Sequence, residues 1–159
     1  MIYKKTTKEL FYSFTMETKV WCEQVYVKTS SFSSPGNLFD GAFANNPIKS
    51  GELVEKGLMR RLSDNKNRGF DGMENPFIFT WSDDIPNYTW AFGSGCVTFY
   101  NTVKDGAANT RVVRHFDEDR FEIYATRDIE KDEELVHTYK SLGWRTAFQE
   151  LNTLINEST

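Results

Sequence analysis

The chain has 159 residues, of which 19 are basic and 23 are acidic, so its formal net charge is −4. This length favours one domain with its own core. The mild negative charge argues against sequence-independent binding to nucleic acid as the main activity. No apolar run reaches the roughly 18 residues of a membrane span, and the N-terminus lacks a signal-peptide core, so we expect an intracellular protein that binds no membrane.

The cysteine and histidine content predicts no metal site. Cys22 and Cys96 are too few and too far apart in sequence for a zinc cluster or a disulfide scaffold. Their apolar and small neighbours are typical of buried free thiols in a reducing compartment. His115 and His137 lie in separate predicted strands, and no cluster of cysteines or carboxylates joins them at ligand spacing.

The N-terminal third predicts an extension followed by short strands. Residues 1–17 form the predicted extension, in which Leu10, Phe11 and Phe14 share one face of a short helix, and the main domain is expected over 18–159. Alternation over 19–28 predicts a strand, and the serine-rich segment 29–37 predicts a loop. Residues 41–55 predict a hairpin: a strand at 41–44, a turn closed near Gly51, and a second strand.

The remainder of the chain predicts further strands and a closing helix. Segment 63–75 is polar and rich in glycine, as a long loop would be, and 76–81 is an aromatic, β-branched strand followed by a turn over 82–87. Residues 111–116 and 120–125 flank a polar turn and give the strongest hairpin signal. A C-terminal amphipathic helix is indicated by apolar residues at helical spacing: Trp144, Phe148, Leu151 and Leu154 or Ile155.

Three stretches carry a family resemblance. Residues 41–52 contain Gly-Ala-Phe-Ala and Ile-Lys-Ser-Gly-Glu, Asn101-Thr102 is followed by Ala108-Asn109, and 127–139 runs from Arg-Asp-Ile through Glu-Glu-Leu to Tyr139. They resemble the opening Gly-x-Gly segment, the Asn-His-Ser…Pro-Asn loop and the closing Glu-Glu-Leu…Tyr strand of SET-domain protein lysine methyltransferases, in the minimal form of viral and bacterial proteins. The resemblance covers roughly residues 21–148.

The resemblance implies both a fold and a reaction. The implied fold is mainly β, a β-clip SET fold of small curved sheets with a short C-terminal helix. Its C-terminal pseudoknot threads the loop around Asn101 together with the strand that ends at Tyr139. The implied reaction transfers a methyl group from S-adenosyl-L-methionine to the side-chain amine of a lysine in a protein or peptide, with cofactor and peptide entering from opposite faces. The sequence leaves the substrate, the number of methyl groups and the oligomeric state open, a homodimer included.

The resemblance also implies roles for particular residues. Tyr139 falls where the family keeps its catalytic tyrosine, and a phenol with a pKa near ~10 is a poor base at neutral pH but can orient an amine by hydrogen bonding. The implied cofactor site consists of Gly41, Ala42, Phe43, Tyr100, Asn101, Thr102 and Trp144. The residues expected to line the substrate channel are Phe77, Phe79, Trp81 and Tyr124.

The chain departs from the family pattern at several positions. Phe39-Asp40-Gly41 lacks the first glycine of Gly-x-Gly, Thr102 replaces the usual histidine, and Ala108 replaces the usual proline with two extra residues before it. No cysteine follows Tyr139, so the zinc-binding cluster of many relatives is missing, and Trp144 with Phe148 is expected to close the channel. These departures keep open a second function, a catalytically silent SET-like module that binds a protein partner.

Without the family, each of these residues has a purely structural alternative. Tyr139 would cap the core at a strand end, Gly41 would serve a turn, and Asn101 would bond its own backbone. The acidic runs 117–119 and 132–134 are expected on solvated faces. A third reading is a β-rich protein unrelated to the family, and it predicts a structure without the threaded loop.

Overall fold

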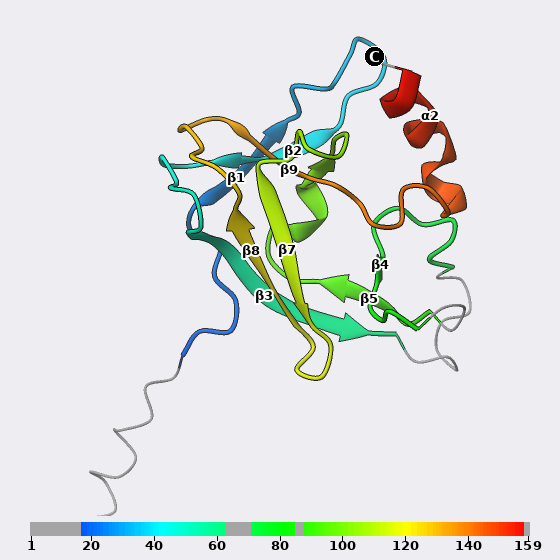
Figure 1. Cartoon of the computed structure of the whole chain (residues 1–159), viewed down its shortest axis with the longest axis horizontal. Coiled ribbons are helices and arrows are strands. Elements are labelled where there is room, and N and C mark those ends of the chain that lie inside the picture. The colour runs from blue at the N-terminus through cyan, green and yellow to red at the C-terminus, as the bar shows by residue number, and fades with distance from the viewer. Residues whose placement is uncertain (1–16, 63–70, 85–87, 158–159) are drawn as a thin grey trace, which may run out of the picture.

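The computed structural model describes residues 17–62, 71–84 and 88–157, and within them nine strands form two sheets (Figure 1). The predicted helix face of Leu10, Phe11 and Phe14, and most of the predicted loop at 63–75, lie outside the described residues. The first sheet has four strands in the order β1-β2-β9-β6, with β1 (Val25–Thr29), β2 (Asp40–Ala44), β9 (Glu134–His137) and β6 (Asn101–Thr102).

Strand β9 is central to this first sheet. It pairs antiparallel with β2 and parallel with β6, where Asn101 lies opposite Val136 and Thr102 opposite His137. All four of its residues are buried. A strand from the C-terminal part of the chain is therefore inserted between two strands that precede it in sequence.

The second sheet has five strands in the order β4-β5-β3-β8-β7. The predicted hairpin of 111–116 and 120–125 is confirmed, because β7 and β8 pair through six residues and β8 buries Phe121, Ile123 and Ala125 on one face. The strands are β3 (Leu53–Arg61), β4 (Phe79–Thr80), β5 (Trp90–Gly93), β7 (Thr110–His115) and β8 (Arg120–Ala125).

The hairpin predicted over 41–55 is wrong, although its strands and turn exist. Gly51 has the positive φ of +85° that a turn glycine adopts, and β2 and β3 lie on either side of it. The two strands belong to different sheets, however: β2 pairs with β1 and β9, whereas β3 pairs with β5 and β8. The turn passes the chain from one sheet to the other, and turn chemistry alone does not choose a strand's partner.

Two predicted strands are shorter than expected. The strand predicted over 19–28 is reduced to β1, because a turn closed by Val25 N–H to the carbonyl of Cys22 (3.0 Å) separates β1 from Trp21, which bridges to Lys56 in β3. The strand predicted over 76–81 is reduced to two residues. A turn with a long hydrogen bond from Ile78 N–H to the carbonyl of Asn75 (3.4 Å) precedes it.

The C-terminal helix is present but differs from the prediction. Helix α2 (Gln149–Glu157) follows a short 3₁₀ helix at Thr146–Phe148, and Trp144 lies before both in a turn. None of the residues of α2 is buried, and Leu154 is 61% exposed. Of the apolar residues on which the helix was predicted, only Phe148 is buried, and it precedes α2.

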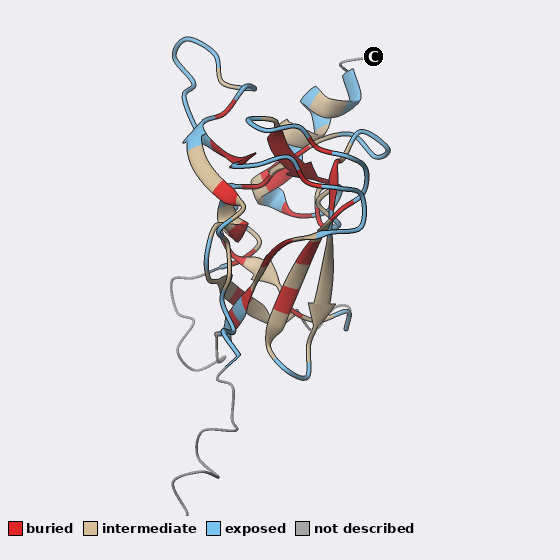
Figure 2. Cartoon of the chain, turned by 90° about the vertical axis from the view of Figure 1, so that its left-hand side faces the viewer, coloured by how far each residue is buried: buried red, intermediate tan, exposed pale blue. Residues whose placement is uncertain are grey.

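The buried residues gather in the interior between the strands, while the loops and α2 are mostly exposed (Figure 2). The core joins both sheets, with Ala42 and Leu135 from the first and Val54, Phe121 and Ile123 from the second. Among the described helices, none has the length and apolar character needed to cross a bilayer.

Candidate functional site

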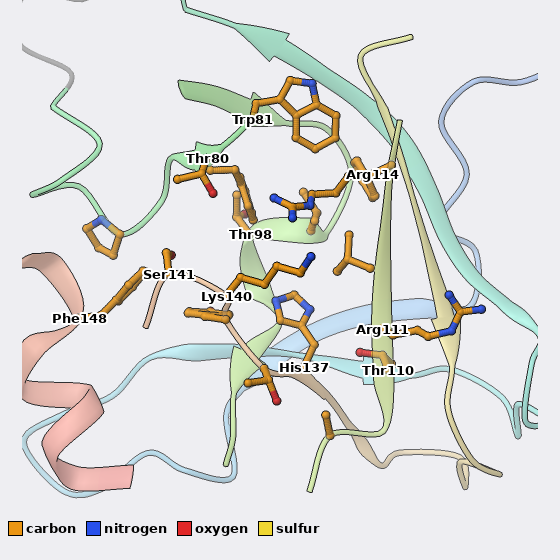
Figure 3. A pocket seen from close by; sticks show the side chains of 18 of the residues that line it. Thr80, Trp81, Thr98, Thr110, Arg111, Arg114, His137, Lys140, Ser141 and Phe148 are labelled. Atoms are coloured by element: carbon orange, nitrogen blue, oxygen red, sulfur yellow. The ribbon is translucent and has the colours of Figure 1, made fainter. Parts of the chain in front are cut away.

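A cavity of about 660 Å³ lies where the five-stranded sheet curls on itself (Figure 3). Residues of both edge strands, β4 and β7, contribute to its lining, and His137 at the end of β9 with residues 138–141 after it completes the wall. Small-molecule sites typically span about 300 to 1,000 Å³. The apolar part of the wall includes Phe79, Trp81, Val97 and Phe148.

Tyr139 lies in the wall of this cavity and is fixed at both ends. Its backbone N–H donates to the hydroxyl of Thr102 (3.0 Å), and its phenol donates to the backbone carbonyl of Tyr100 (2.6 Å). The ring packs against His137 and Phe148, each with a centroid separation of 5.2 Å. Burial raises the pKa of Tyr139 to about 12, so the phenol keeps its proton at neutral pH and acts as a hydrogen-bond donor.

His137 and Thr138 place buried polar atoms without partners next to Tyr139. The imidazole of His137 stacks on the ring of Tyr100, with centroids 5.8 Å apart and planes 9° from parallel. Its Nδ1 and the hydroxyl of Thr138 have no hydrogen-bond partner among the described residues. Burial lowers the pKa of His137 to about 4, so the ring is neutral at physiological pH. Such orphaned atoms are costly unless a ligand or water satisfies them.

On the other face of β9, Glu134 is the centre of a compact polar cluster. One carboxylate oxygen accepts from the hydroxyl of Ser30 (2.7 Å) and the amide of Asn101 (3.0 Å), and the other accepts from the N–H and hydroxyl of Ser31 (2.8 and 2.5 Å). A Cβ added at Gly41 would lie 2.3 Å from this carboxylate. The glycine is therefore required by the close approach of Glu134. We refer to Ser30, Ser31, Gly41, Asn101 and Glu134 as the Glu134 cluster.

Glu134 is ionised in this cluster. Burial alone would raise the pKa of its carboxyl, but the hydrogen bonds from Ser31, Ser30 and Asn101 outweigh it and hold the pKa below its usual value. A negative charge is thus fixed beside the backbone of Gly41. The prediction that the acidic run 132–134 is solvated is wrong for Glu134, because β9 is a central strand and buries it.

Asn109 connects the loop after β6 to β9. Its amide donates to the carbonyl of Glu134 (2.8 Å), and its side-chain oxygen accepts from the N–H of Val136 (2.8 Å). Thr110 adds a hydrogen bond from its hydroxyl to the carbonyl of Val136 (2.9 Å). Asn101 in β6 and Asn109 in the loop after it therefore both bond to Glu134 of β9.

Tyr139 and Asn101 lie close together at strand β6, but their side chains point in different directions. The Tyr139 phenol bonds to the carbonyl of Tyr100, and Asn101 is the next residue. The amide of Asn101 points away, toward Ser30, Glu134 and the carbonyl of Asp40. The side chains of β9 also point to alternate faces of the sheet, so Glu134 and His137 lie on opposite faces.

The other predicted cofactor residues are mostly buried. Ala42 and Phe43 are buried, and their strand β2 is paired with β1 on one side and β9 on the other. Tyr100 is also buried, and its phenol donates to Glu55 (2.8 Å). Trp144 is 37% exposed and stacks on Tyr88 at a centroid distance of 4.5 Å, and it does not line the cavity.

Two of the four predicted channel residues line the cavity, and two do not. Phe79 and Trp81 are in its wall. Phe77 is 65% exposed in the turn before β4. Tyr124 lies on the face of β8 opposite Phe121, since neighbouring strand residues point to opposite sides, and only Phe121 lines the cavity.

The two cysteines come together in the fold, which their separation in sequence did not indicate. The sulfur atoms of Cys22 and Cys96 and a carboxylate oxygen of Glu55 lie within 4.8 Å of one another. Both oxygens of Glu55 accept hydrogen bonds, from Cys96 N–H (2.7 Å) and Tyr100 (2.8 Å). Burial raises the pKa of Glu55 to about 7 and that of Cys96 to about 12, so the Cys96 thiol keeps its proton at neutral pH. We interpret the group as a hydrogen-bonded part of the core.

The SET domain family matches residues 40–140, and the chain belongs to this family. Its fold is similar to the crystal structure of a Plasmodium falciparum protein named as a candidate histone methyltransferase, with a TM-score of 0.52, 20% identity, and coverage of 73% of this chain and 96% of that one. A chain of the Chaetomium thermophilum polycomb repressive complex 2 gives a TM-score of 0.52 at 22% identity, covering 72% of this chain and 15% of that one.

These likenesses support the fold alone, because both identities are low. No curated protein matches the sequence. The mainly β SET fold with a single short helix in the described residues is thereby confirmed, and the viral or bacterial type stays a prediction.

Proposed function

We propose that the chain is a protein lysine methyltransferase that uses S-adenosyl-L-methionine. The observation that carries this proposal is Tyr139, a half-buried tyrosine whose phenol donates to the carbonyl of Tyr100 (2.6 Å) in the wall of a large cavity of a SET domain. Its pKa of about 12 suits a group that orients an amine and does not remove a proton from it.

Two features of the chain fit the cofactor. The ionised Glu134 beside Gly41 supplies negative charge for a ligand that carries a sulfonium and an ammonium group. Following the family resemblance, we assign Asn101 on that face and Tyr139 on the cavity face to holding it. When bound, S-adenosyl-L-methionine supplies the methyl group, whose bond to sulfur breaks as a bond to the lysine nitrogen forms.

The residues of the cavity act by position and desolvation. A lysine amine must be neutral to attack, and apolar walls such as Phe79 and Val97 disfavour the ammonium form and lower its pKa. Fixing an amine in the reactive orientation is worth up to about 7 to 11 kcal/mol in well-aligned reactions. The Tyr139 phenol donates its one proton to Tyr100 and packs against Phe148, so its oxygen is a fixed acceptor for an N–H of the amine and leaves the nitrogen lone pair free to attack.

The test combines binding and transfer. We expect calorimetry to detect S-adenosyl-L-methionine binding, and mass spectrometry to detect added methyl groups on lysine in host-protein extracts. Tyr139→Phe should lower turnover by about 100-fold or more while cofactor affinity stays within about threefold. Tyr26→Phe is the matched control, since its phenol bonds only to the exposed Asp132, and it should retain turnover. Comparable turnover in Tyr139→Phe would refute the role.

A second candidate function is a silent SET-like module that binds a protein partner. The absent first glycine at Phe39 favours it, as does the space beside Gly41, which Glu134 and Asn101 fill. The absence of any cofactor binding in the calorimetry would support this module. In either case we expect a protein partner, and a reducing compartment in which Cys22 and Cys96 are free thiols.

A further inference from the structure

The charges around the cavity run against the charge of the whole chain. The chain has a net charge of −4, yet the lining of the cavity contains one carboxylate, Asp105, and five cationic side chains. These cations are Arg111, Arg114, Arg127, Lys140 and Arg145. A cavity lined by one sign of charge focuses its field on an entering ligand.

Three of the five cations are engaged away from the cavity centre. Arg127 pairs with Glu133, and the side chain of Arg111 turns away from the cavity centre, with its guanidinium over the ring of Tyr124 at 5.0 Å (Figure 3). Arg145 is buried and donates to backbone carbonyls of 72 and 75 while its guanidinium lies over the ring of Phe148. These three contribute to the field but are not free to bind a ligand directly.

The other two, Arg114 and Lys140, extend into the cavity from different walls (Figure 3). The Arg114 side chain is 15% exposed and is fixed by Asp83 (3.1 Å) and by the ring of Phe116 (5.0 Å), which leaves most of its five N–H donors available. Lys140 is exposed and has no carboxylate within 4.0 Å in the described part of the chain. Two positive groups that converge on one space form a site for a carboxylate.

We propose that this site selects lysines in an acidic sequence context, with an aspartate or glutamate next to the target lysine bound by Arg114 and Lys140. The inference rests on the proposed function in naming lysine as the reacting group. The hydroxyls of Thr98 and Ser141 also line the cavity and add neutral donors for a carboxylate. The same two cations lower the pKa of the target amine, which keeps it in the reactive neutral form.

A carboxylate can also come from the cofactor, whose amino-acid end carries one. If the carboxylate belongs to the cofactor, removing the charge of Lys140 should weaken cofactor binding. If it belongs to an acidic substrate, the same change should weaken peptide binding only. Lys140 itself is a lysine at the cavity, so the mass of the protein after incubation with cofactor must be checked for methylation of its own chain. The experiment below separates these outcomes.

The first measurement is peptide binding to the full chain, because it does not depend on turnover. Three peptides of equal length carry one central lysine flanked by glutamate, glutamine or arginine. By fluorescence anisotropy at low salt, we expect the glutamate peptide to bind at least about tenfold more tightly than the arginine peptide. The difference should shrink as salt is raised, since exposed charges are screened. Transfer kinetics with the same peptides should show the same order in kcat/KM.

The second measurement uses charge-removing variants. Lys140→Gln should reduce the preference for glutamate over arginine by about fivefold to tenfold, with the affinity for S-adenosyl-L-methionine unchanged. Lys140→Arg should restore the preference, because it keeps the charge. Lys131→Gln removes one exposed positive charge outside the cavity lining and should leave the preference intact. Arg114→Gln should have the same effect as Lys140→Gln if its fold, checked by circular dichroism, is retained.

Each result of these measurements either supports or overturns the inference that the site selects an acidic sequence context. Equal or tighter binding of the arginine peptide overturns the acidic-context inference, as does a Lys140→Gln variant whose only change is weaker cofactor binding. Methylation confined to Lys140 of the enzyme also overturns it. A clear preference for the glutamate peptide, with no methyl transfer and no cofactor binding, would support the acidic-context inference and contradict the proposed methyltransferase activity.

Discussion

The two faces of β9 treat their polar groups in opposite ways. On the face of the Glu134 cluster, a carboxylate accepts four hydrogen bonds from Ser30, Ser31 and Asn101. On the cavity face, His137 and Thr138 each bury a polar atom that has no partner among the described residues. Only a few residues of chain separate these environments.

The difference distinguishes polar groups that stabilise the fold from polar groups that are available to a ligand. Buried polar groups that satisfy one another stabilise a particular fold, whereas unsatisfied ones cost stability and persist where a ligand completes them. The Glu134 cluster holds β2, β6 and β9 together around Gly41. The cavity face, with His137, Thr138 and Tyr139, is the incomplete side, and it is there that we expect the substrate.

The largest expected effect concerns the stability of the Glu134 cluster. Glu134→Ala should lower the free energy of unfolding by about 3 to 4 kcal/mol, because Ser30, Ser31 and Asn101 would lose their shared acceptor. Urea denaturation followed by tryptophan fluorescence measures it. Glu130→Ala, an exposed residue in the same acidic stretch, is the control and should change stability by no more than about 0.5 kcal/mol. Similar losses in both variants would mean that the cluster is not a structural unit.

A second prediction uses pH to compare Glu55 with His137. Glu55 has a pKa of about 7 in the fold against an ordinary 4.5, so its contribution to stability is complete below pH 4.5 and is lost as pH rises through 7. His137 has a pKa of about 4 against 6.5, so its contribution is complete above pH 6.5 and is lost as pH falls toward 4. The two slopes have opposite signs.

The measurement is the difference in unfolding free energy between each variant and the wild type, which cancels the titration of the other groups. For Glu55→Gln this difference should rise by about 2 kcal/mol from pH 4.5 to 7, and for His137→Phe it should fall by a similar amount from pH 4 to 6.5. Slopes of the same sign would show that at least one of the two groups is not buried as described.

The sequence predicted local structure well and long-range pairing poorly. The hairpin of β7 and β8 follows from alternation around a polar turn, a signal contained in neighbouring residues. The hairpin over 41–55 failed because β2 found its partner β9 some 90 residues away, which no local pattern reveals. Cys22 and Cys96, which lie together beside Glu55, were missed for the same reason.

The candidate site was predictable only through the family resemblance. That resemblance brought forward Tyr139 and Asn101, and in the structure Asn101 belongs to the short strand β6 while the N–H of Tyr139 donates to Thr102 of the same strand. Glu134 was missed because an acidic run is usually solvated, and its burial depends on β9 being a central strand. Arg114 and His137 were missed because a strand residue faces a cavity only once the sheet has curled, which composition and alternation do not report.

The smallest expected effects compare two hydroxyls beside Tyr139, one without a partner and one that accepts a hydrogen bond. Thr138→Val removes a buried hydroxyl without a partner and should raise the free energy of unfolding by about 0.5 to 1 kcal/mol. Thr102→Val removes a hydroxyl that accepts from the N–H of Tyr139 and should lower it by about 1 kcal/mol. Both substitutions replace a hydroxyl by a methyl group of similar size, so the sign depends mainly on whether the hydroxyl had a hydrogen-bond partner. Destabilisation by Thr138→Val would mean that its hydroxyl has a partner and that the cavity face is already complete without a ligand.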